Sequence, residues 1–289
     1  MTVVSAATIV GSMTAFAVVS EAGAAPSSAP TVTNLPRQGV APPSGIRNTW
    51  AASNWSGYAE SGTYTGVSAT WTVPTVGASN SATYSSAWVG VDGFTNSNLI
   101  QTGTEEDFYN GAAHYNAWWE ILPASETALP SSDAVNGGDR MTASIYETPA
   151  TVTTRGGPKH STEHVWVITI SDTTGKGWTF STQQGYNGGG TSAEWIVEAP
   201  EVGGRIATLN HYTITPPSGI GDFDNAGVLS SIVNSGTPTY TGAKLNYQSD
   251  SGTMIQNRVQ VSTPGDPDVP ALSAFNAAYG SGLPATPTG

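Results

Sequence analysis

Apolar and small polar residues alternate along much of the chain. In the run from Gly66 to Val73, the side chains of Val67, Ala69, Trp71 and Val73 fall on one face and small polar residues on the other. A period of two predicts a strand with one buried face, since successive side chains in a strand point to opposite sides. Runs of the same kind are Ala87–Val91, Tyr115–Leu122, Met141–Tyr146, His164–Ser171, Trp178–Thr182, Ala193–Glu198 and Thr253–Val261.

Gly, Pro, Asn and Asp bound these runs, which is typical of antiparallel strands joined by hairpins or Greek-key connections. No window of the chain has sustained helical periodicity, and no repeat of fixed period indicates a propeller or a solenoid. The pattern therefore predicts an all-β fold, a β-sandwich of two antiparallel sheets. We expect one such domain over residues 49–280.

The two ends of the chain lack this alternation. Residues 1–25 are small and apolar and finish in Ala-Gly-Ala-Ala, which is typical of a secretory signal, although no Lys or Arg precedes Arg37. A membrane anchor is the alternative, but Glu21 ends the apolar run. Residues 26–48 are predicted to be a Pro/Ser-rich linker or propeptide and residues 281–289 a flexible tail. We expect a secreted, extracellular protein with no stable membrane insertion after removal of the signal.

Composition narrows the classes of function. The 289 residues include 9 Lys and Arg against 21 Asp and Glu, a formal net charge of −12, so no basic stripe is available to bind nucleic acid. The absence of cysteine excludes disulfides, thiol nucleophiles and cysteine metal sites. Only 10% of the residues are charged, so we expect few stabilising carboxylate interactions to be lost in acid. We expect a monomer.

Common catalytic signatures are absent from the sequence: there is no G-x-S-x-G, no H-E-x-x-H, no P-loop and no glycine-rich dinucleotide turn. His160 and His164 are four residues apart, but that spacing in a strand separates them by about 13 Å. We therefore expect surface loop histidines rather than a shared metal. No metal and no cofactor are predicted.

Five short clusters combine aromatic, amide and carboxylate residues. In the last cluster Glu194, Ile196 and Glu198 share one face of a predicted strand, with Trp195 and Val197 on the other. A buried carboxylate costs free energy, so it should be paired, hydrogen-bonded or functional, whereas a solvated face for Glu198 is the simpler interpretation of this cluster alone. The clusters are Asn54–Tyr58, Ala87–Gly93, Leu99–Gly103, Tyr115–Glu120 and Ala193–Glu198.

In this order the five clusters resemble the glutamic peptidases, the eqolisin family, over residues 54–200. The resemblance implies a sandwich whose curved inner face holds two catalytic residues. These are Gln101, in a turn shortly after the second cluster, and Glu198, the second acid of the last cluster. It implies substrate-binding positions in the cleft for Trp55, Trp88, Asp92 and Glu120.

The sequence departs from the fungal pattern of that family in places that bear on subsite preference. The stretch between Gln101 and Trp118 is longer and holds three consecutive acids, Glu105–Asp107. Asn116 stands where the fungal motif has Asp, Leu122 replaces the aromatic before the proline, and the fungal disulfides are absent.

The resemblance implies direct attack of water on a peptide bond of a polypeptide substrate. Glu198 would remove a proton from the water and later return it to the leaving amine, and Gln101 would donate its amide N–H to the oxyanion. Because the ordinary pKa of Glu is near 4.3, we expect an optimum at about pH 2–5.

Two other classes of function fit a concanavalin or lectin-like sandwich. A glycoside hydrolase would need two carboxylates, and Glu194 with Glu198 would be about 13 Å apart, whereas Glu120 with Glu198 remains possible. A noncatalytic carbohydrate-binding protein is suggested by the abundance of Trp. Plain core packing is the alternative for Trp55 and Trp88.

Overall fold

The computed structural model describes residues 29–41, 50–156, 159–209, 220–255, 259–265, 273–279 and 283–287. The predicted signal, residues 1–25, lies outside the described residues, as does part of the predicted linker 26–48. By its contacts the chain divides into two units, residues 1–30 and residues 31–289, and all strands of the structure belong to the second. Within the predicted tail 281–289, Ala285 accepts a hydrogen bond from Asn276.

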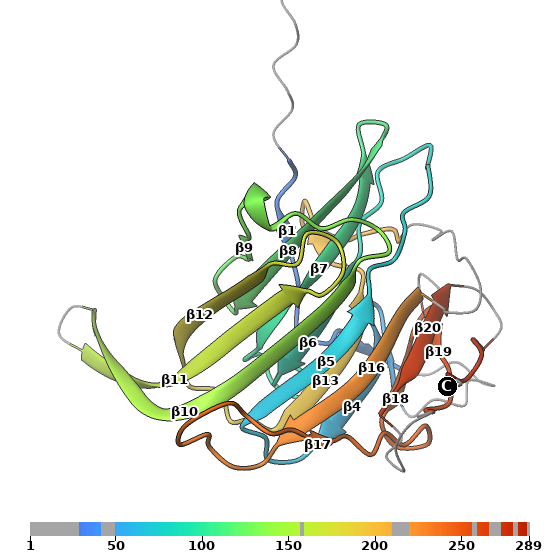
Figure 1. Cartoon of the computed structure of the whole chain (residues 1–289). Helices are drawn as coiled ribbons and strands as arrows, with labels where there is room; N and C mark the ends of the chain where they lie inside the picture. The colour runs from blue at the N-terminus through green and yellow to red at the C-terminus, as the bar shows by residue number, and fades with distance from the viewer. Residues whose placement is uncertain are drawn as a thin grey trace, which may run out of the picture. The chain divides into compact units, whose positions relative to one another are not determined.

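The described residues are almost entirely strands, with one short 3₁₀ helix, η1 (Ser131–Asp133), and none of their helices is long and apolar enough to cross a membrane. Two layers of strands form the sandwich that the alternation predicts, and Figure 1 shows β6, β13 and β4 behind β5 and β16. The first layer consists, in order, of β12 (Thr179–Tyr186), β11 (Lys159–Asp172), β10 (Arg140–Gly156), β5 (Gly66–Thr72), β16 (Ile220–Leu229), β20 (Phe275–Tyr279) and β19 (Val259–Val261), with β17 (Thr241–Gly242) beside β16.

The second layer carries the candidate site. It consists, in order, of β9 (Thr127–Ala128), β8 (Ala112–Ile121), β7 (Ile100–Tyr109), β6 (Ser86–Val91), β13 (Ser192–Glu198), β4 (Trp55–Ser61), β18 (Ser251–Met254), β3 (Trp50–Ala52) and β2 (Gly39–Val40). A separate small sheet contains β1 (Val32–Thr33), β14 (Glu201–Val202) and β15 (Arg205–Ile206).

Pairing within the layers is antiparallel except between β18 and β3. The layers are joined where Met254 of β18 pairs with Val259 of β19. The single strand predicted over Thr253–Val261 is therefore wrong, because the chain reverses direction between these two short strands. The prediction of surface loop histidines is wrong as to the loop, since His160 and His164 both lie in β11, but His164 is exposed as predicted. Nδ1 of His164 lies 2.7 Å from Oε1 of Glu147.

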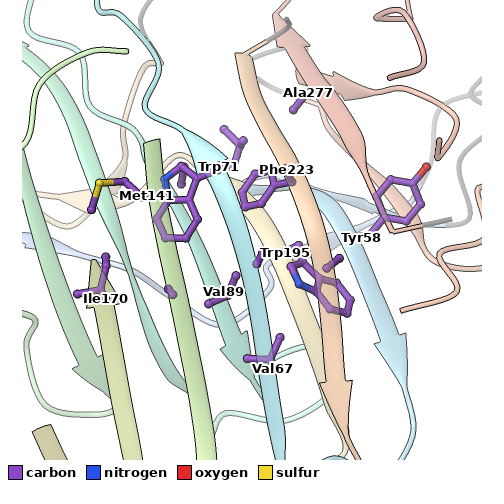
Figure 2. Packing of buried hydrophobic residues seen from close by; sticks show 14 of the residues in the cluster. Tyr58, Val67, Trp71, Val89, Met141, Ile170, Trp195, Phe223 and Ala277 are labelled. Carbon is purple, nitrogen blue, oxygen red and sulfur yellow. The ribbon is translucent and has the colours of Figure 1, made fainter. Parts of the chain in front are cut away.

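The main core lies between the two layers. Figure 2 shows Val67 and Trp71 of β5 and Phe223 of β16 close to Val89 of β6 and Trp195 of β13, and all five are fully buried in one cluster. Stacked aromatic rings extend this core toward β20, since Phe223 lies 5.0 Å from Phe275. The alternation predicted for β5 and β13 is confirmed, because the residues assigned to the inner faces fill this core.

A second apolar cluster covers the opposite face of the second layer. It includes Ile196 of β13 and the indoles of Trp55 and Trp88, and all three are fully buried. Glu194 and Glu198 point to this same side, because they alternate with Trp195 and Val197 of the main core. The fold thus places the last cluster's carboxylates on the outer face of the second layer, among buried aromatic rings.

Candidate active site

Glu198, the last residue of β13, is fully buried and accepts three hydrogen bonds. Its Oε1 accepts from the backbone N–H of Leu35 at 2.8 Å and from Nδ2 of Asn54 at 3.2 Å. Its Oε2 accepts from Nε1 of Trp88 at 2.9 Å. The solvated-face interpretation of Glu198 is therefore wrong, and three donors converge on a carboxylate where an isolated buried charge would be unstable.

Burial raises the pKa of Glu198 well above its ordinary value, and the charge of Glu120 adds to this increase. The hydrogen bonds from Leu35, Trp88 and Asn54 oppose it, because donors favour the ionised form. Desolvation is the largest of these causes, so the pKa will fall when water reaches the carboxyl.

Gln101 of β7 and Glu120 of β8 are directly opposite each other in the antiparallel ladder. Nε2 of Gln101 donates to Oε2 of Glu120 at 2.7 Å, and both side chains are fully buried. Gln101 thus lies in a strand, and its placement in a turn is wrong. Burial raises the pKa of Glu120 to about 8, the charge of Glu105 adds to the increase, and hydrogen bonds from Gln101 and the backbone of Asn34 oppose it. In acid Glu120 is therefore neutral.

Gln101 and Glu198 lie on strands that are separated by β6. The ladder places Ser86 opposite Glu198, and Gly90, four residues further along β6, opposite Gln101. This offset corresponds to about 13 Å along the strands and about 10 Å across them, or about 16 Å between Cα atoms. Both side chains project from the outer face of the layer, and the charge of Glu120, the partner of Gln101, raises the pKa of Glu198, so the two residues belong to one site.

The indoles of Trp55 and Trp88 pack edge to face at 4.9 Å, within the buried outer cluster. Each also uses its N–H in the candidate site. Nε1 of Trp88 binds Glu198, and Nε1 of Trp55 donates to the carbonyl of Leu35 at 2.9 Å. Core packing and a polar role at the site therefore coexist in the same two residues.

The carboxylate of Asp92 accepts hydrogen bonds in the turn that follows β6. Asp92 is buried with a φ of 72° and accepts hydrogen bonds from Tyr186, Asn96 and the Gly190–Thr191 backbone. Burial raises its pKa, but these hydrogen bonds outweigh burial and hold the pKa below its usual value. In the described part of the chain none of its hydrogen bonds reaches Gln101 or Glu198, so a substrate-binding role for Asp92 stays a prediction.

Two side chains near the site were not selected from the sequence. Asn54 donates to Glu198, and its position beside Trp55 at the start of the first cluster was the available signal. Glu126 lies near Glu105 and Glu120; burial and hydrogen bonding with Glu105 raise its pKa to about 11. No sequence signal marked Glu126, which lies outside the five clusters. No three His, Asp or Glu side chains of the described residues are arranged to hold a metal ion.

Comparison with known proteins places the chain in a family and shows a shared fold. Residues 53–265 match the model of the Peptidase A4 family. Aspergillopepsin-2 of Aspergillus niger is 30% identical over 189 residues, which are 57% of this chain and 62%, less than two thirds, of that protein. A crystal structure of scytalido-glutamic peptidase with a transition state analog inhibitor has a TM-score of 0.53 at 22% identity, covering 78% of this chain and 98% of that chain. A second, with a peptide based transition state analog, has a TM-score of 0.50 at 21% identity and the same coverage. At these identities the structures show a shared fold.

Proposed function

The chain belongs to the Peptidase A4 family, and from this premise we propose that it is a glutamic-type endopeptidase that acts in acid on polypeptides. The observation that carries the proposal is the buried carboxyl of Glu198, held by three donors on the outer face of the second layer. Gln101 projects from the same face two strands away and donates to Glu120, whose charge acts on Glu198. Both residues fall within the region that matches the family.

In the proposed mechanism water binds between these two side chains. Ionised Glu198 takes a proton from the water, whose oxygen adds to the carbonyl carbon of the peptide bond. Gln101 donates one amide hydrogen to Glu120, which leaves the other for the developing oxyanion. Glu198 then passes its proton to the leaving amine, and the C–N bond breaks to give a carboxylic acid and an amine.

Acid operation follows from the charges around the oxyanion. The pKa of Glu120 is about 8, because Glu120 is buried, so in acid its carboxyl is neutral and does not repel the oxyanion. Glu198 must still ionise, which becomes easier once its burial is relieved by an open, hydrated cleft. Loss of the proton of Glu120 therefore sets the alkaline limit of the proposed working range, and ionisation of Glu198 sets its acid limit.

Family membership also supports the coarser expectations about partners and location. We propose a secreted monomer, with residues 1–25 as its export signal, acting outside the cell. The net charge of −12 supports polypeptide rather than nucleic-acid substrates. Size-exclusion chromatography and the N-terminal sequence of the protein recovered from culture medium test these points.

Digestion of a denatured protein at pH 2–7, with pepstatin present, tests the activity. The wild type should act best in acid, and Gln101→Ala should lose nearly all turnover, whereas Gln183→Ala, an exposed glutamine of β12, should match the wild type. Proteolysis retained by Gln101→Ala, or a maximum at neutral pH, would overturn the proposal. Cleavage of a polysaccharide with the protein substrate left intact would favour the glycosidase alternative on Glu120 and Glu198.

A further inference from the structure

Two carboxyl groups that the proposed mechanism does not use lie beside Gln101 and Glu120. Glu105 lies four residues after Gln101 on the same face of β7, because successive side chains of a strand alternate. Glu126 lies in the segment between β8 and β9 and immediately precedes β9. The side chains of Glu105 and Glu126 are hydrogen-bonded to each other and are called the carboxyl couple below. A hydrogen bond between two carboxyl groups needs a proton, so one member of the couple is a neutral acid.

The contacts around the couple decide which member keeps the proton. The side chain of Asn116, directly opposite Glu105 in the ladder, also hydrogen-bonds Glu105 and so favours its ionised form. Burial and the charge of Glu105 raise the pKa of Glu126 to about 11. Glu126 is therefore the neutral donor and Glu105 the acceptor. Oε2 of Glu126 is buried with no partner among the described residues, so its carboxyl depends on the bond to Glu105.

The backbone of Glu126 reaches the candidate site itself. Its N–H donates to the carboxyl of Glu120, which also accepts from Nε2 of Gln101 at 2.7 Å. The strand β9 pairs with β8 through only two residues, so the side-chain bond to Glu105 gives this segment a second anchor. Through Glu126 the carboxyl couple is thus joined to the acceptor that orients Gln101.

The couple also acts on the charge of Glu120. Burial raises the pKa of Glu120 to about 8, and the charge of Glu105 adds to the increase. Because Glu126 keeps its proton to a higher pH than Glu120, the couple stays intact over the range in which Glu120 titrates. The other ionisable groups that interact with the couple or with Glu120 are Glu106, Asp107 and Tyr109 of β7 and Glu198 of β13.

We propose that Glu126 is a positioning residue for the peptidase reaction. Its protonated carboxyl, bonded to Glu105, fixes its backbone N–H on Glu120, and the couple thereby keeps Glu120 in place as the neutral acceptor for Gln101. Glu126 acts through Glu120 and Gln101 and makes no contact with the reacting atoms. The role rests on the proposed function, because Gln101 is the group that it positions.

Two substitutions of Glu126 separate positioning from a merely structural role. Glu126→Ala removes the bond to Glu105, so kcat on a quenched fluorescent peptide at pH 4 should fall at least about tenfold. Glu126→Gln keeps an N–H donor for Glu105 and should retain a kcat close to that of the wild type. Ser125→Ala, at an exposed position in the same segment, is the matched control and should match the wild type. Equal kcat for folded Glu126→Ala and Ser125→Ala, or equal losses for the two Glu126 variants, would overturn the proposal.

Titration of Glu120 gives a readout that needs no catalysis. NMR of protein with ¹³C-labelled Glu carboxyls follows its midpoint, and the signal is identified by its absence in Glu120→Gln. Glu105→Gln removes the charge that raises the pKa of Glu120, so the midpoint should fall by about one pH unit. Glu163→Gln, at a half-exposed position of β11, should leave it unchanged.

The two measurements distinguish the positioning role from the peptidase activity. An unchanged midpoint in folded Glu105→Gln would overturn the proposal, even in a protein that hydrolyses polypeptides. A wild type that hydrolyses no polypeptide, together with the lowered midpoint in Glu105→Gln, would contradict the proposed function and support the action of the couple on Glu120.

Discussion

Replacement of Glu194 by Gln should change how the stability of the protein depends on pH. Glu194 is fully buried on β13, and neither carboxyl oxygen has a hydrogen-bond partner among the described residues. Burial raises its pKa well above the ordinary value, the charge of Asp92 adds to the increase, and the nearby Ser192 hydroxyl opposes it only in part. The folded protein therefore holds a proton that the unfolded chain releases above about pH 4.5.

The sign and size of the effect follow from proton linkage. A carboxyl whose pKa is higher in the folded state contributes its full stabilisation below the unfolded pKa. That contribution is lost as the pH rises toward the folded pKa. Each pH unit in that window costs about 1.4 kcal/mol for one carboxyl. Gln has nearly the same shape and does not titrate. Glu194→Gln should therefore lie within about 1 kcal/mol of the wild type at pH 4 and gain about 1.4 kcal/mol on it per pH unit above pH 5.

Urea unfolding followed by Trp fluorescence at half-unit steps from pH 3.5 to 7 measures this difference. Trp195, the neighbour of Glu194, is buried in the main core and reports the transition. Glu163→Gln, at a half-exposed position of β11, is the matched control and should track the wild type. A constant difference in unfolding free energy between Glu194→Gln and the wild type at all pH values would contradict a raised pKa, because Glu194 would then ionise alike in the folded and unfolded states.

Three further substitutions have defined outcomes. Trp88→Phe removes the N–H that lowers the pKa of Glu198, so kcat/KM should fall at least about tenfold and the acid limb of its pH profile should move to higher pH. Asp92→Asn should destabilise the protein by about 2 kcal/mol in urea unfolding at pH 6 and by less at pH 2.5, because a lowered pKa stabilises above the unfolded value and that stability is lost in acid. Gly103→Ala should cost about 1–3 kcal/mol by the same measurement, since its Cβ would lie 2.4 Å from the Ala87 carbonyl and 2.5 Å from Cβ of Trp88.

The alternation of apolar and polar residues correctly predicted those strands in which every residue of one face is apolar. For β5, β6 and β13 the predicted bounds differ from the observed ones by at most one residue. The strand β7 was missed because Glu105–Asp107 interrupts its pattern with three acids that are typical of a solvated loop. These acids are nevertheless buried, and burial raises their pKa values.

Carboxyls with raised pKa values change the expectation about stability in acid. Low charge predicted that few carboxylate interactions would be lost there. The structure adds buried carboxyls at Glu106, Glu126 and Glu194 whose raised pKa values make the folded protein more stable when they are protonated. Sequence could not indicate this effect, because it depends on which acids the two layers bury.

The position of residues 31–41, which contact the site through Leu35, could not be predicted from their own sequence. They have no apolar periodicity, and their partners are distant in the chain, since Leu35 and Glu198 are 163 residues apart. Arg37 was noted only as the first basic residue, and its contacts with the rings of Phe94 and Trp50 depend on the tertiary structure. Long-range pairing of this kind is set by tertiary structure rather than by local pattern.

The most direct test of the peptidase mechanism compares two glutamates on the same face of β13, Glu198 and Glu194, which are both fully buried. Glu198→Gln and Glu194→Gln are made in the otherwise unchanged chain, and kcat on a quenched fluorescent peptide is measured at pH 4. If Glu198 is the general base, Glu198→Gln should lose about 10²–10⁴-fold in kcat and Glu194→Gln should change it by less than about threefold. Comparable activity of the two folded variants would contradict that role.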